Sequence, residues 1–134
     1  MITHFRRVTI IRVQKPEKQD INADLQWFSK SLGLFGARDK EKSCFRVFLE
    51  LLKASKRHKG LTSDEIADRA NLSRGTVIHH INTLAEQGLL MKSGNKYMLR
   101  VSNLEELVQE LKKEISVVFK DLEKAAEELD EALA

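Results

Sequence analysis

The chain has 134 residues, of which 42% are hydrophobic and 32% charged, and this length suits one domain with an appendage. No apolar run approaches the roughly 18 residues that a membrane span needs, and the N-terminus lacks the pattern of a secretory signal. The single cysteine, Cys44, excludes an internal disulfide and a cysteine-based metal cluster within one chain. We therefore expect a cytoplasmic protein, because a chain without an internal disulfide suits a reducing compartment.

Charge is distributed unevenly along the chain. Residues 1–100 contain 19 Lys+Arg and 10 Asp+Glu, whereas residues 101–134 contain 4 and 10. The body is therefore strongly basic and the C-terminal segment acidic, although the net charge is only +3. A basic body favours a polyanionic partner, with nucleic acid as the leading candidate. The alternative interpretation is a solvated basic face with no such partner.

The first 36 residues form an N-terminal extension. Residues 4–13 are rich in β-branched side chains, which predicts a strand. Asp20 is expected to cap a helix that runs to about Leu32, because apolar residues follow it at helical spacing: Ile21, Leu25, Phe28 and Leu32. Gly33–Gly36 predicts an apolar loop. We assign residues 1–36 to a strand and helix extension, which either adds a strand to a neighbouring sheet or crosses to a partner subunit.

A second helix is expected to begin near Asp39. Its wide apolar face consists of Cys44, Phe45, Val47, Phe48, Leu51 and Leu52. The helix ends in a cationic run, residues 56–59, and Gly60 suits the exit of the chain. In this apolar setting Cys44 is interpreted as a buried, inert thiol rather than a redox sensor. Trp27 and Phe28 are interpreted as core residues rather than a ligand cage.

Residues 37–101 carry the strongest local signals. Thr62 and Glu65 form a capping box at the start of a helix that buries Ile66, Ala67 and Ala70. Asn71 suits a tight turn, and Ser73 caps a further helix over about 74–87, whose inward residues are Val77, Ile81, Leu84 and Ala85. Gly88 ends that helix, and Leu89–Val101 predicts a hairpin that turns at Ser93–Asn95. Two short helices joined by a three-residue turn, followed by a hairpin, predict a winged helix-turn-helix.

The helix over about 74–87 would be the recognition helix. Arg74 can donate two hydrogen bonds to a guanine or to a phosphate, and Asn82 can pair with an adenine edge. Ile78 is apolar at an outward position, which suits a thymine methyl. The candidate DNA-binding residues of this helix are Ser73, Arg74, Gly75, Thr76, Ile78, His79, Asn82 and Thr83. In the wing, Lys92, Lys96 and Arg100 suit the flanking backbone or minor groove, or else are solvated edge-strand cations.

Residues 102–134 predict one long helix, capped by Ser102 or Asn103 with Glu105 or Glu106 in the matching third position. Its apolar residues repeat every seven positions over four heptads, as in a coiled coil. The candidate dimerisation residues are Leu104, Val108, Leu111, Ile115, Val118, Leu122 and Leu129, with Ala125 and Ala132 continuing the stripe. A small body cannot cover a helix of about 45 Å. We expect the stripe to pair with a second copy; the alternative is that it packs back on its own domain.

The segment Leu72–Leu90 resembles the recognition helix and wing entry of ArsR-type winged-helix transcription repressors. The matching positions are Leu72-Ser73, Thr76-Val77, His80-Ile81, Leu84 and Gly88-Leu89. The resemblance covers about 61–101, and the upstream Trp27–Lys40 stretch is similar to a subgroup of archaeal regulators of this class. It implies a homodimeric DNA-binding regulator, with His80 packing between helices and His79 facing DNA or solvent.

The chain departs from the metal-sensing members of that family. It has no Cys-x-Cys pair and no histidine on the terminal helix, and the adjacent His79 and His80 point to different sides of a helix. We therefore expect no metal and no cofactor, and the identity or existence of an effector stays open.

The sequence therefore predicts a mainly α fold with a small β wing, built as a winged helix-turn-helix with a long C-terminal dimerisation helix. The predicted function is a homodimeric, sequence-specific DNA-binding transcriptional regulator whose partners are double-stranded DNA and a second copy of itself. The alternatives are a winged-helix protein-interaction module and a sequence-blind architectural DNA-binding protein. An enzyme is disfavoured because the chain lacks a glycine-rich phosphate loop, a nucleophile elbow and a metal-spacing motif.

Overall fold

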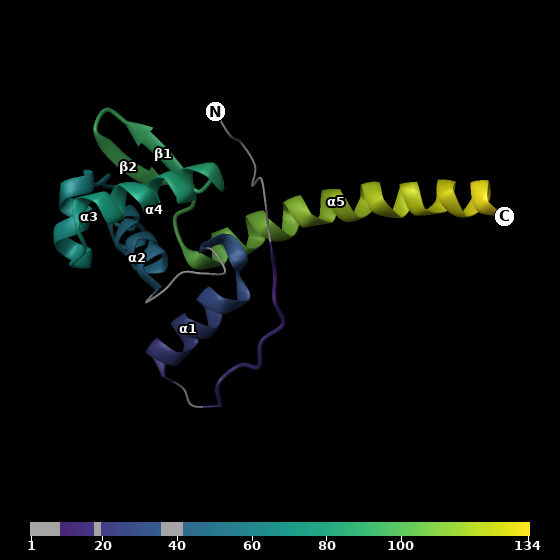
Figure 1. Cartoon of the computed structure of the whole chain (residues 1–134), viewed down its shortest axis with the longest axis horizontal. Coiled ribbons are helices and arrows are strands. Elements are labelled where there is room, and N and C mark those ends of the chain that lie inside the picture. Colours follow the sequence, from purple (N-terminus) through teal and green to yellow (C-terminus); the bar gives the residue numbers. More distant parts are fainter. Residues whose placement is uncertain (1–8, 18–19, 36–41) are drawn as a thin grey trace.

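The computed structural model describes residues 9–17, 20–35 and 42–134. The order of elements is α1 (Ile21–Ser31), the short 3-10 helix η1 (Gly33–Phe35), α2 (Ser43–Ser55), α3 (Ser63–Ala70), α4 (Arg74–Glu86), β1 (Leu90–Ser93), β2 (Lys96–Leu99) and α5 (Leu104–Leu133). Helices α2, α3 and α4 form one body with the β1–β2 hairpin, whereas α1 lies to one side and α5 projects away from the body (Figure 1). The fold is a winged helix-turn-helix with a long C-terminal helix, as the sequence predicts.

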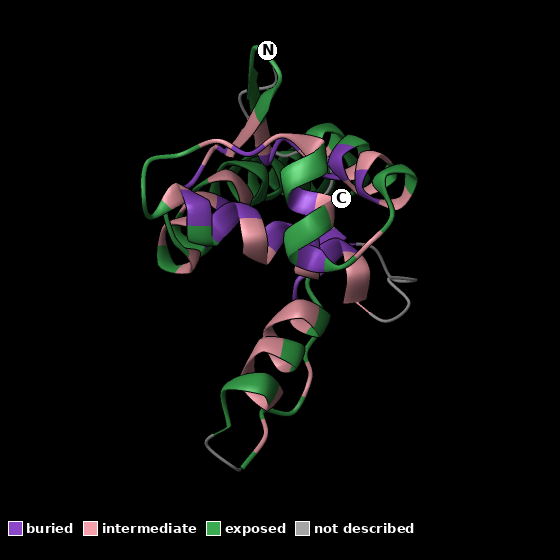
Figure 2. Cartoon of the chain, turned by 90° about the vertical axis from the view of Figure 1, so that its left-hand side faces the viewer, coloured by how far each residue is buried: buried purple, intermediate pink, exposed green. Residues whose placement is uncertain are grey.

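The hydrophobic core lies around α2. The inner faces of α2, α3 and α4 meet there, together with Leu89, Leu99 and Val101 beside the hairpin. Phe35 of η1 closes one end of this core, because its ring lies 4.9 Å from that of Phe45 and 5.0 Å from that of Phe48. Figure 2 shows the buried residues gathered in the body and the exposed ones around it. Burial of each large apolar side chain stabilises the fold by about 1.5–3 kcal/mol.

Short-range signals set the ends of the helices. Asp20 accepts a hydrogen bond from the amide of Asn22 and caps α1. At the start of α3 the Thr62 hydroxyl accepts from the Glu65 amide, and the Glu65 carboxylate accepts from the Thr62 amide, both at 3.1 Å. Asn71 ends α3 in the left-handed conformation with φ of 53°. These three predictions from local sequence are confirmed.

The wing is built as predicted, with one addition. β1 and β2 pair antiparallel from Leu90 opposite Leu99 to Ser93 opposite Lys96, which leaves a two-residue turn. Gly94 in that turn has φ of 62°, a conformation that glycine adopts without steric cost. Leu61 adds a bridge to Tyr97 on the outer side of β2, with N–H···O distances of 3.0 and 2.7 Å. The connection between α2 and α3 is therefore tied to the wing.

The N-terminal extension differs from the prediction. Over residues 9–13 the expected strand is reduced to one bridge, between Ile10 and Leu32, and residues 4–8 lie outside the described part of the chain. The reason is that this segment lies beside the end of α1 and beside η1, which are helical and not strands. Within residues 9–13, the Ile11 amide donates to the Ser31 carbonyl and the Thr9 carbonyl accepts from the Gly33 amide. The segment thus lies against α1 and η1, and the described residues add no strand to the wing sheet.

Two local expectations are also corrected, the burial of Ala85 and the exit of the chain from α2. Ile21 is 77% exposed because α1 lies to one side of the body, and Ala85 is exposed on the outer face of α4. α2 begins at Ser43, while the expected start, Asp39, lies outside the described residues. The chain leaves α2 through His58, which has φ of 55°, rather than through Gly60.

The long helix α5 has two parts. Asn103 caps it by accepting from the Glu106 amide at 2.7 Å. Leu107 and Leu111 are then buried in the body, because α5 starts at Leu104, close to the buried Val101. The expectation that Leu111 belongs to an intermolecular stripe is therefore wrong, and Leu107 was missed. From residue 116 onward every residue of α5 is exposed.

Candidate nucleic-acid interface

The interface is built on α3 and α4, which a three-residue turn joins. The inner face of α4, with Val77, Ile81 and Leu84, is buried against the core. The ring nitrogen Nε2 of His80 lies 2.7 Å from the Ser43 hydroxyl at the start of α2. This contact confirms that His80 packs between helices. As a result, the opposite face of α4 points toward solvent.

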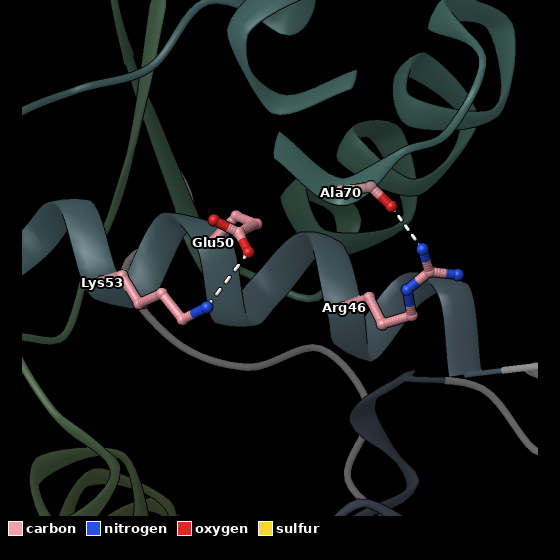
Figure 3. A network of polar contacts seen from close by, with 4 residues as sticks. All are labelled: Arg46, Glu50, Lys53 and Ala70. Carbon is pink, nitrogen blue, oxygen red and sulfur yellow. Dashed lines mark hydrogen bonds and ion pairs between the residues drawn. The ribbon is translucent and has the colours of Figure 1, made fainter. Parts of the chain in front are cut away.

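Arg46 holds the turn of the helix-turn-helix in place. Its guanidinium donates a hydrogen bond from α2 to the backbone carbonyl of Ala70, the last residue of α3 (Figure 3). Carbonyls in the last turn of a helix lack an intrahelical partner, and a cation there is favourable. On the same helix the exposed Lys53 pairs with Glu50 at 3.2 Å. Sequence reasoning missed Arg46, because nothing local marks an arginine that reaches a carbonyl 24 residues away.

The outward face of α4 carries most of the predicted contact residues. Arg74, Gly75, His79 and Asn82 are exposed, and Thr76, Ile78 and Thr83 are half-buried. The spacing of Gly75, His79 and Asn82 places them along one face of the helix. Guanidinium, imidazole, amide and methyl groups thus lie side by side on a single helix surface.

The start of α4 presents the exposed cation of Arg74 to this surface. The Arg74 side chain is 71% exposed and lies 3.5 Å from the Asp64 carboxylate of α3. An ion pair between two exposed side chains contributes only about 0–1 kcal/mol. Arg74 can therefore leave Asp64 for a phosphate or a base edge. A Cβ at the neighbouring Gly75 would meet no atom within 4 Å, so a DNA backbone could approach closely there.

Two predicted contact residues act within the helix. The Ser73 hydroxyl accepts from the Thr76 amide at 3.2 Å and donates to the Thr76 hydroxyl at 2.8 Å, which confirms Ser73 as the cap. The Thr83 hydroxyl donates to the His79 carbonyl at 3.2 Å. These hydroxyl groups stabilise the helix that presents the surface.

In the wing, two of the three predicted cations reach the surface. Lys92 and Lys96 are exposed, and the Lys92 ammonium lies 5.5 Å from the centre of the Tyr97 ring. Arg100 is different: its side chain is 18% exposed and lies 3.6 Å from the Glu114 carboxylate of α5. Its assignment to the wing surface is therefore corrected, because Arg100 follows β2 at the base of the hairpin and faces α5.

Other kinds of site do not emerge from the described residues. Within the described ranges, no three His, Cys, Asp or Glu side chains gather as a metal site would require. None of the described helices combines the length and apolar character that a membrane crossing needs. Cys44 is buried beside Phe45 and Phe48, as expected for a core thiol.

A family model described as "Helix-turn-helix domain" matches residues 41–92. The match covers α2, α3 and α4 and enters β1. No curated protein and no solved structure matches the chain. The protein therefore carries a helix-turn-helix domain, and a domain of this class points to DNA binding and transcription regulation.

Proposed function

We propose that the protein is a homodimeric, sequence-specific DNA-binding transcriptional regulator of the ArsR type. One observation carries the proposal: within a helix-turn-helix domain, the outward face of α4 combines exposed Arg74, His79 and Asn82 with a half-buried Ile78. Base edges in the major groove are read by these side-chain types. Sequence-independent binding instead relies mainly on cations that neutralise phosphates.

In this proposal α4 enters the major groove from its N-terminal end. Arg74 binds a guanine edge or a phosphate, Asn82 an adenine edge, and Ile78 a thymine methyl. The backbone amides of the first turn of α4 face the phosphates. Lys92 and Lys96 of the wing neutralise the flanking backbone or enter the minor groove.

Dimerisation through the distal part of α5 completes the proposal. The apolar side chains there are 55–60% exposed in the single chain: Val118, Phe119, Leu122 and Leu129. Val118, Leu122 and Leu129 continue a seven-residue repeat, which buries its stripe only by pairing with another helix. A second copy supplies that helix, and the resulting two-fold dimer would read two half-sites.

The test compares binding of duplex DNA by the wild type and by Arg74→Ala and Asn82→Ala. Each variant is expected to weaken binding to a selected duplex by about 1–3 kcal/mol and to relax preference at one base position. Lys30→Ala, which removes an exposed cation from α1, is the matched control and should bind like the wild type. Unchanged affinity and unchanged preference in both α4 variants would overturn the assignment of this helix.

The salt dependence of binding separates this function from a protein-interaction module. Neutralising phosphates releases counterions, so the affinity of a DNA-binding protein falls steeply as salt rises. The absence of duplex binding at moderate salt would instead favour the interaction module. Equal retention of all sequences would favour an architectural protein.

A further inference from the structure

A second basic surface lies apart from the face of α4. It is a cleft of about 380 Å³ between the end of α2, the following turn, α3 and β2. Four cationic side chains line it, together with one histidine and one carboxylate: Arg57, Lys59, Arg69, Lys96, His58 and Glu65. Among these, only Lys96 belongs to the predicted DNA contacts, and no residue of α4 contributes.

The turn after α2 brings these cations to the cleft. The Lys59 amide donates to the Ala54 carbonyl at 3.0 Å, which folds the chain back over the helix end. His58, at the reversal, adopts the left-handed conformation with φ of 55°. Glycine usually occupies this position, since the conformation is unfavourable for residues with a side chain. Such backbone strain persists only where the surroundings maintain it, and it clusters at functional sites.

The charge of the cleft is not cancelled from within. Glu65 is the only carboxylate among the lining residues, and it is held at the start of α3 by the Thr62 amide at 3.1 Å. Arg57, Lys59 and Arg69 are exposed on long side chains that can follow an extended anion, whereas Lys96 also belongs to the wing surface proposed to contact the first duplex. A small-molecule pocket would be lined mainly by apolar groups, whereas exposed cations on a polar surface suit the phosphates of a nucleic-acid backbone.

The cleft and α4 lie on different flanks of α3. Asp64 pairs with Arg74 at the start of α4, whereas Glu65 and Arg69, one helical turn apart, line the cleft. We propose that the cleft binds the phosphate backbone of a second DNA segment, so that one chain holds two duplexes. This proposal extends the function of the helix-turn-helix and adds a surface that base reading does not require.

The experiment measures how many short duplexes one chain binds at low salt. The probe is a duplex of about 10 bp, one helical turn, and the stoichiometry is read by calorimetry and by sedimentation. The wild type should bind two duplexes per chain. The triple variant Arg57→Ala, Lys59→Ala, Arg69→Ala should bind one, with unchanged helical content by circular dichroism. A matched control, Lys113→Ala, Lys120→Ala, Lys124→Ala, removes three exposed cations from α5 and should still bind two.

Three results would overturn the second site. One duplex per chain in the wild type, unchanged in the triple variant, would show that the cleft binds no DNA. Weaker binding of a single duplex in the triple variant would place the cleft on the same duplex as α4. Tight binding of inorganic pyrophosphate that short duplexes do not displace would make the ligand a free anion. The proposed function fails separately, through loss of all duplex binding by the wild type.

Discussion

At the scale of single residues, polar side chains at helix ends set the geometry of the helix-turn-helix. Thr62, Asn71 and Ser73 are all recognisable in the sequence, because each acts on a backbone group within a few residues. The roles of Arg46 and Arg100 are not recognisable in the sequence. The partner of Arg46 is Ala70, 24 residues away, and the partner of Arg100 is Glu114, 14 residues away. The left-handed conformation of His58 is not predicted from the sequence, because Gly60, two residues later, is the residue type that usually ends a helix.

Replacing Arg46 with methionine should destabilise the protein by about 1.5–3 kcal/mol, because a hydrogen bond to a charged donor is lost and the Ala70 carbonyl is left without its partner. Methionine keeps most of the aliphatic contact. The measurement is the free energy of unfolding in urea. Lys53→Ala, which breaks only an exposed pair with Glu50, is the control and should change stability by less than about 1 kcal/mol. Equal effects of the two variants would contradict the role of Arg46.

Glu65 predicts a pH dependence of stability. The Thr62 amide, followed by the Thr62 hydroxyl group, lowers the pKa of Glu65 from its ordinary value of 4.5. A lowered pKa in the folded state stabilises the protein above the unfolded-state pKa, and this contribution is lost as the pH falls through the folded-state pKa. The stability difference between wild type and Glu65→Gln should therefore be present at pH 7 and vanish in acid. A difference that does not change with pH would show that the charge is unimportant.

At the scale of elements, hydrogen bonds hold the N-terminal segment against α1 and η1. The Gly33 amide donates to the Thr9 carbonyl at 2.6 Å, and the Trp27 indole donates to the Val13 carbonyl at 2.8 Å. Helical periodicity predicts α1 but not which neighbour it packs against. That choice depends on contacts between distant parts of the chain, such as Ile10 with Leu32.

Gly33→Ala should detach this segment, because a Cβ there would lie 2.6 Å from the Thr9 carbonyl oxygen, a backbone atom that cannot turn aside. We expect a loss of about 1–3 kcal/mol, as for other overpacked positions, together with a change in Trp27 fluorescence. Gly75→Ala is the control: it adds a Cβ in open space within a helix and should stabilise the fold by about 0.5–1 kcal/mol. Unchanged stability and unchanged Trp27 fluorescence in Gly33→Ala would contradict this packing.

At the scale of the whole molecule, α5 combines a first part buried in the body with an exposed remainder, and one periodic stripe does not distinguish the two. Its heptads predict a dimer helix, yet Leu107 and Leu111 belong to the core of the same chain. A seven-residue repeat says which face is apolar and not which partner covers it. The boundary near residue 116 between the buried and the exposed part of α5 depends on where the body ends, which the repeat does not indicate.

Removing residues 117–134 should therefore give a folded monomer. The truncation keeps Leu107 and Leu111, whereas a cut after Arg100 would also take away part of the core. We expect sedimentation of the shortened chain as a monomer, with a circular dichroism signal of the body retained and much weaker binding to a palindromic duplex. A dimer that survives this truncation would place the interface on the N-terminal segment and α1 instead.

In the proposed function, α4 reads DNA sequence and a second copy of the chain reads the other half-site. The most direct test is selection of bound duplexes from a random pool by the full chain at about 150 mM salt, a physiological ionic strength. We expect a palindromic consensus whose half-sites lie about one helical turn apart. Recovery of no consensus, whether every sequence is retained equally or none is, would contradict the proposed function.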